Sequence, residues 1–343
     1  MSDPRVPEPE AGAGSQEPGS PGSAGVAHPH DRYFRAVTRG RAEQVALVNT
    51  LFPDVAPLLD PDSIAPIDGT HVDDDLSLLQ TDLALEVRLA GRDVILYVLI
   101  EHQRSVDPLM ALRMVRYQTR IWDRYLKRSS GTKTLPPILS AVIYQGNRPW
   151  TAATELRELI DVDAETAALL GDQLPRWSYR LDDLTTVDAA TLRARPLTPP
   201  LRLCMLVYAE VVGSPDPLAA LRGLRDDIDE VGAGLDGASH LRVAFTYIVT
   251  VSDTPPDQVQ PFADQLGPIA KEALMTTAQR LHDAGHAEGH AQGQAEVLLE
   301  QLTIKFGPQD ADVQLRVMTA PSDHVHTWIR QILTATTVDE VFG

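Results

Sequence analysis

Two strand-like runs follow each other closely at residues 81–89 and 93–103, and no other feature constrains the fold as strongly. Ala90-Gly91-Arg92 separates them as a short turn, so the simplest pairing is a hairpin about Gly91. Residues 94–100 form an unbroken apolar run, typical of a strand buried in a protein interior. The run ends abruptly at Glu101-His102-Gln103, where a carboxylate and an amide meet the end of the buried strand. A charge placed there is costly unless it is paired or binds a metal.

Asp82 supplies a second carboxylate at the start of the preceding strand. In the predicted hairpin, position 82 falls opposite position 101, and Cβ atoms of such cross-strand neighbours are about 5 Å apart. Glu101 and Gln103 are two residues apart and therefore share one strand face. Two close carboxylates repel each other unless a divalent cation lies between them. Mg²⁺ suits such a pair, because it binds one or two carboxylates and completes its shell with water and substrate phosphate.

The order of the remaining elements predicts an α/β fold. A helix over 41–51 and a strand over 64–72 precede the hairpin, and a long helix over 108–127 and a buried strand over 137–144 follow it. Helix, three strands, helix and strand in this order are typical of a sheet covered by helices. In the helix over 108–127 we expect an apolar face formed by five residues. These are Leu109, Leu112, Val115, Ile121 and Leu126.

The chain is acidic overall but carries one basic segment. Its net charge of −18 argues against broad, non-specific nucleic-acid binding. Residues 104–128 nevertheless contain seven basic and two acidic residues. Four arginines in this segment repeat at helical spacing, namely Arg113, Arg116, Arg120 and Arg124. This stripe predicts contacts to DNA phosphates, and a solvated helix face explains it equally well.

Composition narrows the cellular context. The single cysteine, Cys204, excludes an internal disulfide and a cysteine-based zinc cluster, and we expect it to be a buried small residue. No apolar run approaches the roughly 18 residues of a membrane span. The first residues show neither a basic start nor an apolar signal region. These features predict a cytoplasmic protein.

Six short motifs lie in and around the strand pair. They are His30-Asp31-Arg32-Tyr33-Phe34, Thr81-Asp82-Leu83, Tyr97-Val98-Leu99-Ile100-Glu101-His102-Gln103, Pro108-Leu109-Met110, Arg116-Tyr117 and Ile121-Trp122. Together they resemble the motifs of the recombination-promoting nuclease (Rpn) family, whose members are often labelled transposases and belong to the PD-(D/E)XK nuclease superfamily. The resemblance spans about residue 28 to the end and is strongest over 28–146.

The resemblance implies an α/β core of the type αβββαβ, a mixed central sheet flanked by helices, with a mostly helical C-terminal half. It implies that Asp82 and Glu101 bind Mg²⁺, or another divalent cation such as Mn²⁺, and that Gln103 completes the catalytic set. Gln103 stands where many nucleases of this fold have lysine, and a neutral amide can only orient water or phosphate. The Pro-Asp of the superfamily name is also absent, because Thr81 precedes Asp82.

On this basis the chain divides into five parts. They are a disordered tail over 1–28, a nuclease-like domain over 29–180, a helical extension over 181–275, a glycine-repeat helix or linker over 276–296, and a small helical C-terminal domain over 297–343. The glycine repeat and the tail also resemble those of the family. A homo-oligomer formed through the C-terminal helical segments stays open.

Ordinary readings stand beside the functional ones. Asp82, Glu101 and Gln103 are also compatible with plain polar strand ends, and His102 points away from Glu101, so packing or solvation suits it better than a ligand role. His282, His286 and His290 would align on one helix face, but the glycine repeat favours a surface helix or linker over a metal site. The residues and the resemblance together predict a Mg²⁺-dependent DNA endonuclease. The resemblance alone implies a role in DNA recombination. The alternative is a catalytically silent protein that binds DNA or a protein partner.

Overall fold

The computed structural model describes residues 29–67, 83–90, 95–129, 131–252 and 256–343. The tail predicted over 1–28 lies outside these ranges, as do Asp82 and the turn residues 91–94. Within the described ranges, helices precede, interrupt and follow a single mixed sheet, which confirms the α/β class.

The central sheet has five strands in the order β1-β2-β3-β4-β5. Their bounds are Leu59–Pro66 for β1, Leu83–Leu89 for β2, Ile95–Gln103 for β3, Ile138–Tyr144 for β4 and Arg180–Asp183 for β5. The pairs β1–β2 and β2–β3 are antiparallel, whereas β3–β4 and β4–β5 are parallel. Strand β3 is therefore the junction between an antiparallel half and a parallel half.

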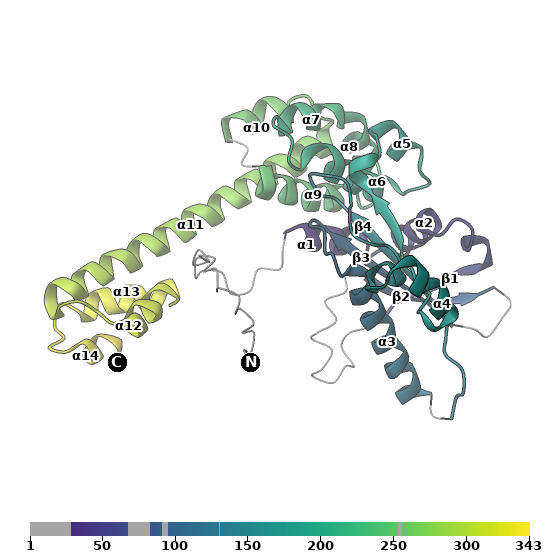
Figure 1. Cartoon of the computed structure of the whole chain (residues 1–343). Coiled ribbons are helices and arrows are strands. Elements are labelled where there is room, and N and C mark those ends of the chain that lie inside the picture. Colours follow the sequence, from purple (N-terminus) through teal and green to yellow (C-terminus); the bar gives the residue numbers. More distant parts are fainter. Residues whose placement is uncertain (1–28, 68–82, 91–94, 130, 253–255) are drawn as a thin grey trace, which may run out of the picture.

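Helices cover both faces of this sheet (Figure 1). On one face, α3 (Met110–Arg128) packs in a small core with Val142 of β4 and Tyr179. On the other face, α1 (Pro29–Val37) and α2 (Arg41–Leu51) join the large core, which also takes Leu85, Ala141 and Ile143 from the strands. A short 3₁₀ helix, η1 (Ala56–Leu58), leads from α2 into β1.

Two strands differ from the predictions. Strand β1 begins at Leu59, earlier than the predicted residue 64, and Pro61 lies inside it. Proline is tolerated because β1 is an edge strand whose pairing with β2 is interrupted between Asp60 and Ala65. Strand β5 was missed, because Arg-Leu-Asp-Asp is short and polar and has no strand pattern of its own.

The predicted apolar face of the long helix was also wrong. Leu109 and Leu126 are 54% and 43% exposed, and of the five predicted residues Ile121 alone is buried. The buried face is displaced around the helix and consists of Met110, Ala111, Met114, Tyr117, Gln118 and Ile121. Two methionines and a tyrosine fill the space against β4 because their long side chains adapt to an irregular surface.

Helices make up most of the chain after β4. Small elements come first and flank β5, namely η4 (Leu156–Leu159), α4 (Ala164–Leu170), η5 (Gly171–Gln173) and η6 (Leu184–Thr186). A bundle follows, formed by α5 (Ala189–Ala194), α6 (Pro199–Leu206), the π-helix η7 (Val207–Val211), α7 (Pro217–Gly223), α8 (Arg225–Gly232), α9 (Gly237–Ser252) and α10 (Pro256–Ala263). This bundle shares the large core with α1 and α2, and Cys204 is buried in it as expected.

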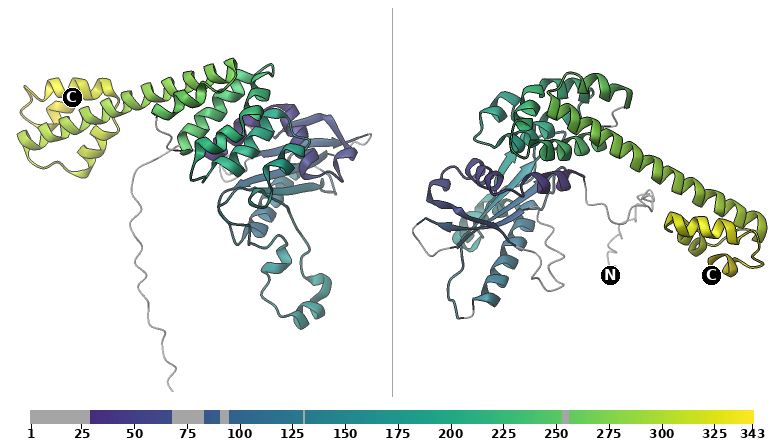
Figure 2. Two further views of the ribbon diagram at one scale, coloured as in Figure 1. Left: turned by 90° about the horizontal axis from the view of Figure 1, so that it is seen from above. Right: turned by 180° about the vertical axis from the view of Figure 1, so that it is seen from behind.

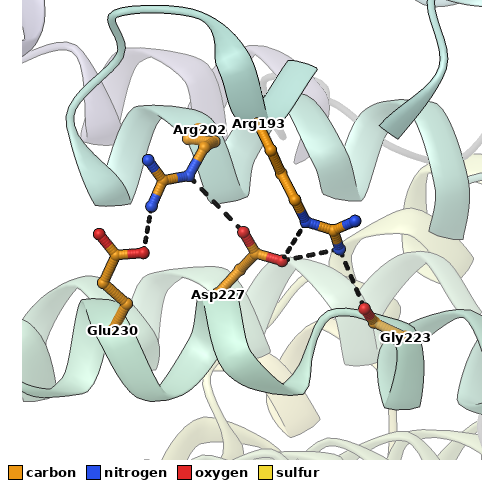
Figure 3. Close-up of polar contacts among 5 residues, drawn as sticks. All are labelled: Arg193, Arg202, Gly223, Asp227 and Glu230. Atoms are coloured by element: carbon orange, nitrogen blue, oxygen red, sulfur yellow. Dashed lines mark hydrogen bonds and ion pairs between the residues drawn. The ribbon is translucent and has the colours of Figure 1, made fainter. Parts of the chain in front are cut away.

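A buried carboxylate ties three helices of the bundle together (Figure 3). Asp227 of α8 accepts hydrogen bonds from Arg193 Nε at 3.0 Å and Arg193 Nη2 at 2.8 Å. Arg202 Nε of α6 lies 3.6 Å from the other carboxylate oxygen, and Arg202 also pairs with Glu230. The hydrogen bond to Asp227 raises the pKa of the Arg193 guanidinium.

A long helix connects the bundle to a separate C-terminal group of helices (Figure 2). Helix α11 (Pro268–Phe306) includes the whole stretch 276–296 that was expected to be a helix or linker. It ends at Gly307, whose φ of 90° suits glycine. The last helices are α12 (Ala311–Met318), α13 (Ser322–Gln331) and α14 (Val338–Phe342), and they form their own core with Leu298 and Leu302.

None of the helices in the described part of the chain is both long and apolar enough to cross a lipid bilayer.

Candidate functional site

The candidate site lies where β2 begins and β3 ends. The two strands are antiparallel, and their described pairs run from Arg88 opposite Ile95 to Leu83 opposite Ile100. This is the register that the hairpin prediction requires. Asp82 lies outside the described residues, so the last described pair is the one next to the predicted carboxylates.

The parallel half of the sheet aligns the ends of β3, β4 and β5. Glu101 pairs with Val142 and Gln103 pairs with Tyr144. Val142 belongs to the core under α3, so α3 covers the face of β4 that carries Val142. Residues paired in neighbouring parallel strands share a sheet face. The end of β3 therefore lies beside the start of α3.

Gln103 is half-buried and is held by the backbone. Its Nε2 donates a hydrogen bond to the carbonyl oxygen of His102 at 3.0 Å. The backbone carbonyl oxygen of Gln103 accepts a hydrogen bond at 2.9 Å from the backbone N–H of Gln145, the residue just after β4. The end of β3 is thus fixed to the residue that follows β4.

Tyr144 and Asp183 extend the row that begins at Gln103, and the sequence analysis did not identify either of them. Asp183 Oδ2 accepts from the Trp150 backbone N–H at 2.8 Å, and its Oδ1 accepts from the Thr185 backbone and hydroxyl at 3.0 and 2.7 Å. Burial, with Asp183 nearby, raises the pKa of Tyr144. Asp183 is the N-cap residue of η6, so these hydrogen bonds give it a structural role. Tyr144 ends β4 and Asp183 ends β5, and the carboxyl ends of parallel strands often carry functional residues. This signal could not be used in the sequence, because β5 was not predicted.

The four arginines of α3 differ in their surroundings. Arg113 Nη1 is 3.0 Å from Asp107 Oδ2 and forms an ion pair with it. Arg116 is exposed, whereas Arg120 and Arg124 are half-buried. Arg116 is therefore the arginine of this stripe that is most open to a ligand from solvent.

His102 lies on the opposite face of β3 from Gln103 and is 3% exposed, so of the two expected surroundings, packed or solvated, the structure shows the packed one. Its ring stacks with Phe34 of α1 at a centroid distance of 5.3 Å and with Tyr208 of η7 at 4.7 Å. Asp31 Oδ1 is 3.7 Å from its Nδ1. The motif at 30–34 and the motif at 101–103 are thus brought into contact, which sequence spacing did not indicate.

In the part of the chain that the structure describes, no group of three or more His, Cys, Asp or Glu side chains is arranged to hold a metal ion. His282, His286 and His290 are exposed on α11, and the rings of the first two are 4.8 Å apart. The predicted pair of Asp82 and Glu101 includes residue 82, which lies outside the described residues.

Comparison with known proteins identifies the class. Residues 28–231 match the family described as "Putative transposase, YhgA-like". The match covers more than half of the chain, so the chain belongs to this family. It includes the sheet, α3 and the bundle as far as α8. No solved structure matches the chain.

Named relatives come from Escherichia coli. The chain is 25% identical over 264 residues to recombination-promoting nuclease RpnD of strain O157:H7, covering 74% of this chain and 94% of that protein. It is 25% identical over 264 residues to recombination-promoting nuclease RpnA of strain K12, covering 75% of this chain and 84% of that protein. It is also 26% identical over 225 residues to the inactive recombination-promoting nuclease-like protein RpnE of K12, covering 63% of this chain and 69% of that protein. The resemblance to recombination-promoting nucleases is therefore confirmed.

Proposed function

We propose that this protein is a metal-dependent DNA endonuclease that promotes recombination, built on a PD-(D/E)XK core. Asp82 and Glu101 would hold Mg²⁺ or Mn²⁺, and Gln103 would orient the attacking water or the phosphate. The observation that carries the proposal is the register of β2 and β3, whose described pairs run up to Leu83 opposite Ile100. The names of the relatives RpnD and RpnA, both nucleases, support the activity.

The donor set fits a hard divalent cation, because carboxylate and amide oxygens are the ligands that Mg²⁺ accepts in proteins. A bound cation lowers the pKa of a coordinated water and neutralises charge that develops on a phosphodiester. In this chain, the amide of Gln103 can position water through hydrogen bonds but brings no positive charge. We therefore expect slower catalysis than in a relative with lysine at this position.

Arg116 gives the proposal a test on DNA binding. It is exposed on α3, the helix that follows β3, and would contact the phosphate backbone. Arg116→Gln should weaken DNA binding by a similar factor for all sequences and lower the salt dependence by about one phosphate contact. Fluorescence anisotropy over a salt series measures both quantities. Arg222→Gln removes an exposed arginine from α7 and should leave both unchanged; equal effects of the two variants would refute a DNA-binding face on α3.

Nicking of supercoiled plasmid DNA tests the activity itself. We expect cleavage in Mg²⁺ or Mn²⁺, little in Ca²⁺, and a loss of about 100-fold or more in Asp82→Ala and Glu101→Ala. Glu86→Ala is a matched control, since Glu86 is a carboxylate of β2 that pairs with Tyr97, well before the end of β3. Cleavage that persists in both site variants would refute the proposed ligands.

A second candidate is a catalytically silent protein that binds DNA or a protein partner. It is favoured by Gln103 in place of lysine and by the similarity to RpnE, which is named as inactive. In the plasmid experiment this candidate predicts DNA binding without cleavage in any divalent cation. We also propose that residues 29–180 form the nuclease-like domain and that the helical parts have the boundaries predicted from the sequence. We propose in addition that the C-terminal helices form the contact of a homo-oligomer.

A further inference from the structure

The buried ring of His102 connects the candidate site to two distant segments of the chain, α1 and η7. His102 lies between Glu101 and Gln103 on β3. Its ring is nearly parallel to Phe34, at an angle of 9°, and is stacked on Tyr208 at 26°. The two aromatic partners come from α1 and from the π-helix η7. π-Helices are rare and are often found at functional sites.

A hydrogen-bond network joins the same elements, α1, η7 and the end of β3. Tyr208 Oη donates to the His30 carbonyl oxygen at 2.8 Å, which joins η7 to α1. His30 Nδ1 lies 2.5 Å from Tyr247 Oη and 3.2 Å from Gln145 Nε2. The Gln145 backbone N–H then bonds the Gln103 carbonyl oxygen. The path therefore ends at Gln103, the residue that follows His102 in β3.

We propose that His102, stacked with Phe34 and Tyr208, is a positioning residue that fixes the end of β3 and thereby the direction of Glu101 and Gln103. We call these three residues the aromatic clamp. This inference rests on the proposed function, because it concerns the same site. A buried ring that stacks with two other rings has little room to rotate, so it restrains the backbone of residue 102 and of its two neighbours.

Phe34 and Tyr208 of the clamp belong to the large core that one face of the sheet shares with the helical bundle. Tyr208 and Tyr247 lie in the bundle, more than one hundred residues after β3, yet they contact the strand that carries the site and the helix that precedes it. Metal ligands need placement to within about 0.5 Å, and the residues that support them decide this placement. The bundle is therefore part of the scaffold of the site.

The test compares variants that keep or remove the stack. His102→Ala removes the central ring, whereas His102→Phe keeps an aromatic ring that can stack with Phe34 and Tyr208. Val231→Ala is the control, since it removes buried volume from the same large core but lies on α8, which contributes no residue to the clamp. For each full-length variant, folding is followed by circular dichroism, plasmid cleavage by kcat and KM, and Mn²⁺ binding by electron paramagnetic resonance.

We expect His102→Ala to lower kcat by about tenfold or more, with KM for DNA changed less than about twofold. We expect its Mn²⁺ affinity to fall by about tenfold, and His102→Phe and Val231→Ala to stay within about threefold of the parent protein. Cleavage and Mn²⁺ binding that survive in folded His102→Ala, or are lost equally in His102→Phe, would overturn the clamp. Failure of the proposed function looks different, because the parent protein itself would then neither cut DNA nor bind Mn²⁺.

Discussion

At the scale of single residues, the buried carboxylate of Asp227 makes the clearest prediction. Asp227→Asn keeps the shape but removes the charge that holds Arg193 and Arg202. Because these guanidinium groups lose their anionic partner in a partly buried place, we expect the free energy of unfolding to fall by about 2 kcal/mol. Urea denaturation measures this loss.

Glu230→Gln provides the comparison for Asp227. Glu230 also pairs with Arg202, but its side chain is 52% exposed, whereas that of Asp227 is 7% exposed. An exposed ion pair contributes about 0–1 kcal/mol, so this variant should stay close to the parent protein. Equal losses in the two variants would show that burial does not set the strength of this network.

The sequence predicted individual residues unevenly. Cys204 was correctly expected to be buried, because its apolar surroundings are a local signal. Strand alternation placed His102 on the face opposite Glu101, but it left open whether the ring is packed or solvated. The network of Asp227 and the clamp around His102 were not predicted. Their members come from different helices and strands, and spacing along one element carries no information about partners far away in the chain.

At the scale of elements, the glycines of α11 decide the stability of its exposed middle. Gly285, Gly289 and Gly293 have open space around them, since an added Cβ would meet no atom within 4 Å. Each glycine costs a helix roughly 0.8 kcal/mol relative to alanine. We therefore expect the triple Gly→Ala variant to be more helical and more stable by about 2 kcal/mol, as measured by circular dichroism at 222 nm during urea unfolding.

Gly237→Ala is the opposite case on α9, because its Cβ would lie 2.4 Å from the Val231 carbonyl oxygen and should destabilise the bundle.

Size-exclusion chromatography of the triple variant adds a second readout. A loss of stability together with dissociation of an oligomer would contradict an open glycine face and would favour close packing of two copies along α11.

Elements were predictable where their pattern was local. The helix α2, the strands β2 to β4 and the break at Gly307 follow from periodicity, apolar runs and glycine. Strand β5 and the buried face of α3 were not, because both are decided by contacts with β4. A short polar strand forms only where a neighbour offers its edge.

At the scale of the whole molecule, buried tyrosines predict a loss of stability in alkali. Burial raises the pKa of Tyr33 and Tyr208 well above the usual range, and raises the pKa of Tyr179 from 10.0 to about 12. These groups stay protonated in the folded protein while they ionise in the unfolded chain. Their contribution is complete below pH 10 and is lost as the pH rises from 10 towards 12.

Urea unfolding midpoints at a series of pH values check this window. We expect little change between pH 8 and 9 and a steep fall above pH 10, with an additional rise in tyrosinate absorbance at 295 nm at the unfolding transition, when the buried tyrosines ionise. Absorbance that rises in the folded protein near pH 10, for as many tyrosines as the chain contains, would show that the aromatic core is open to solvent.

We propose that the carboxylates of Asp82, just before β2, and of Glu101, near the end of β3, make this chain a nuclease. The most direct measurement is the single-turnover rate of DNA cleavage in Mg²⁺ by the parent protein and by Glu101→Gln, with DNA binding measured in Ca²⁺. The claim predicts that Glu101→Gln cuts about 100-fold more slowly while binding DNA within about threefold of the parent. Equal cleavage rates for the two proteins would contradict it.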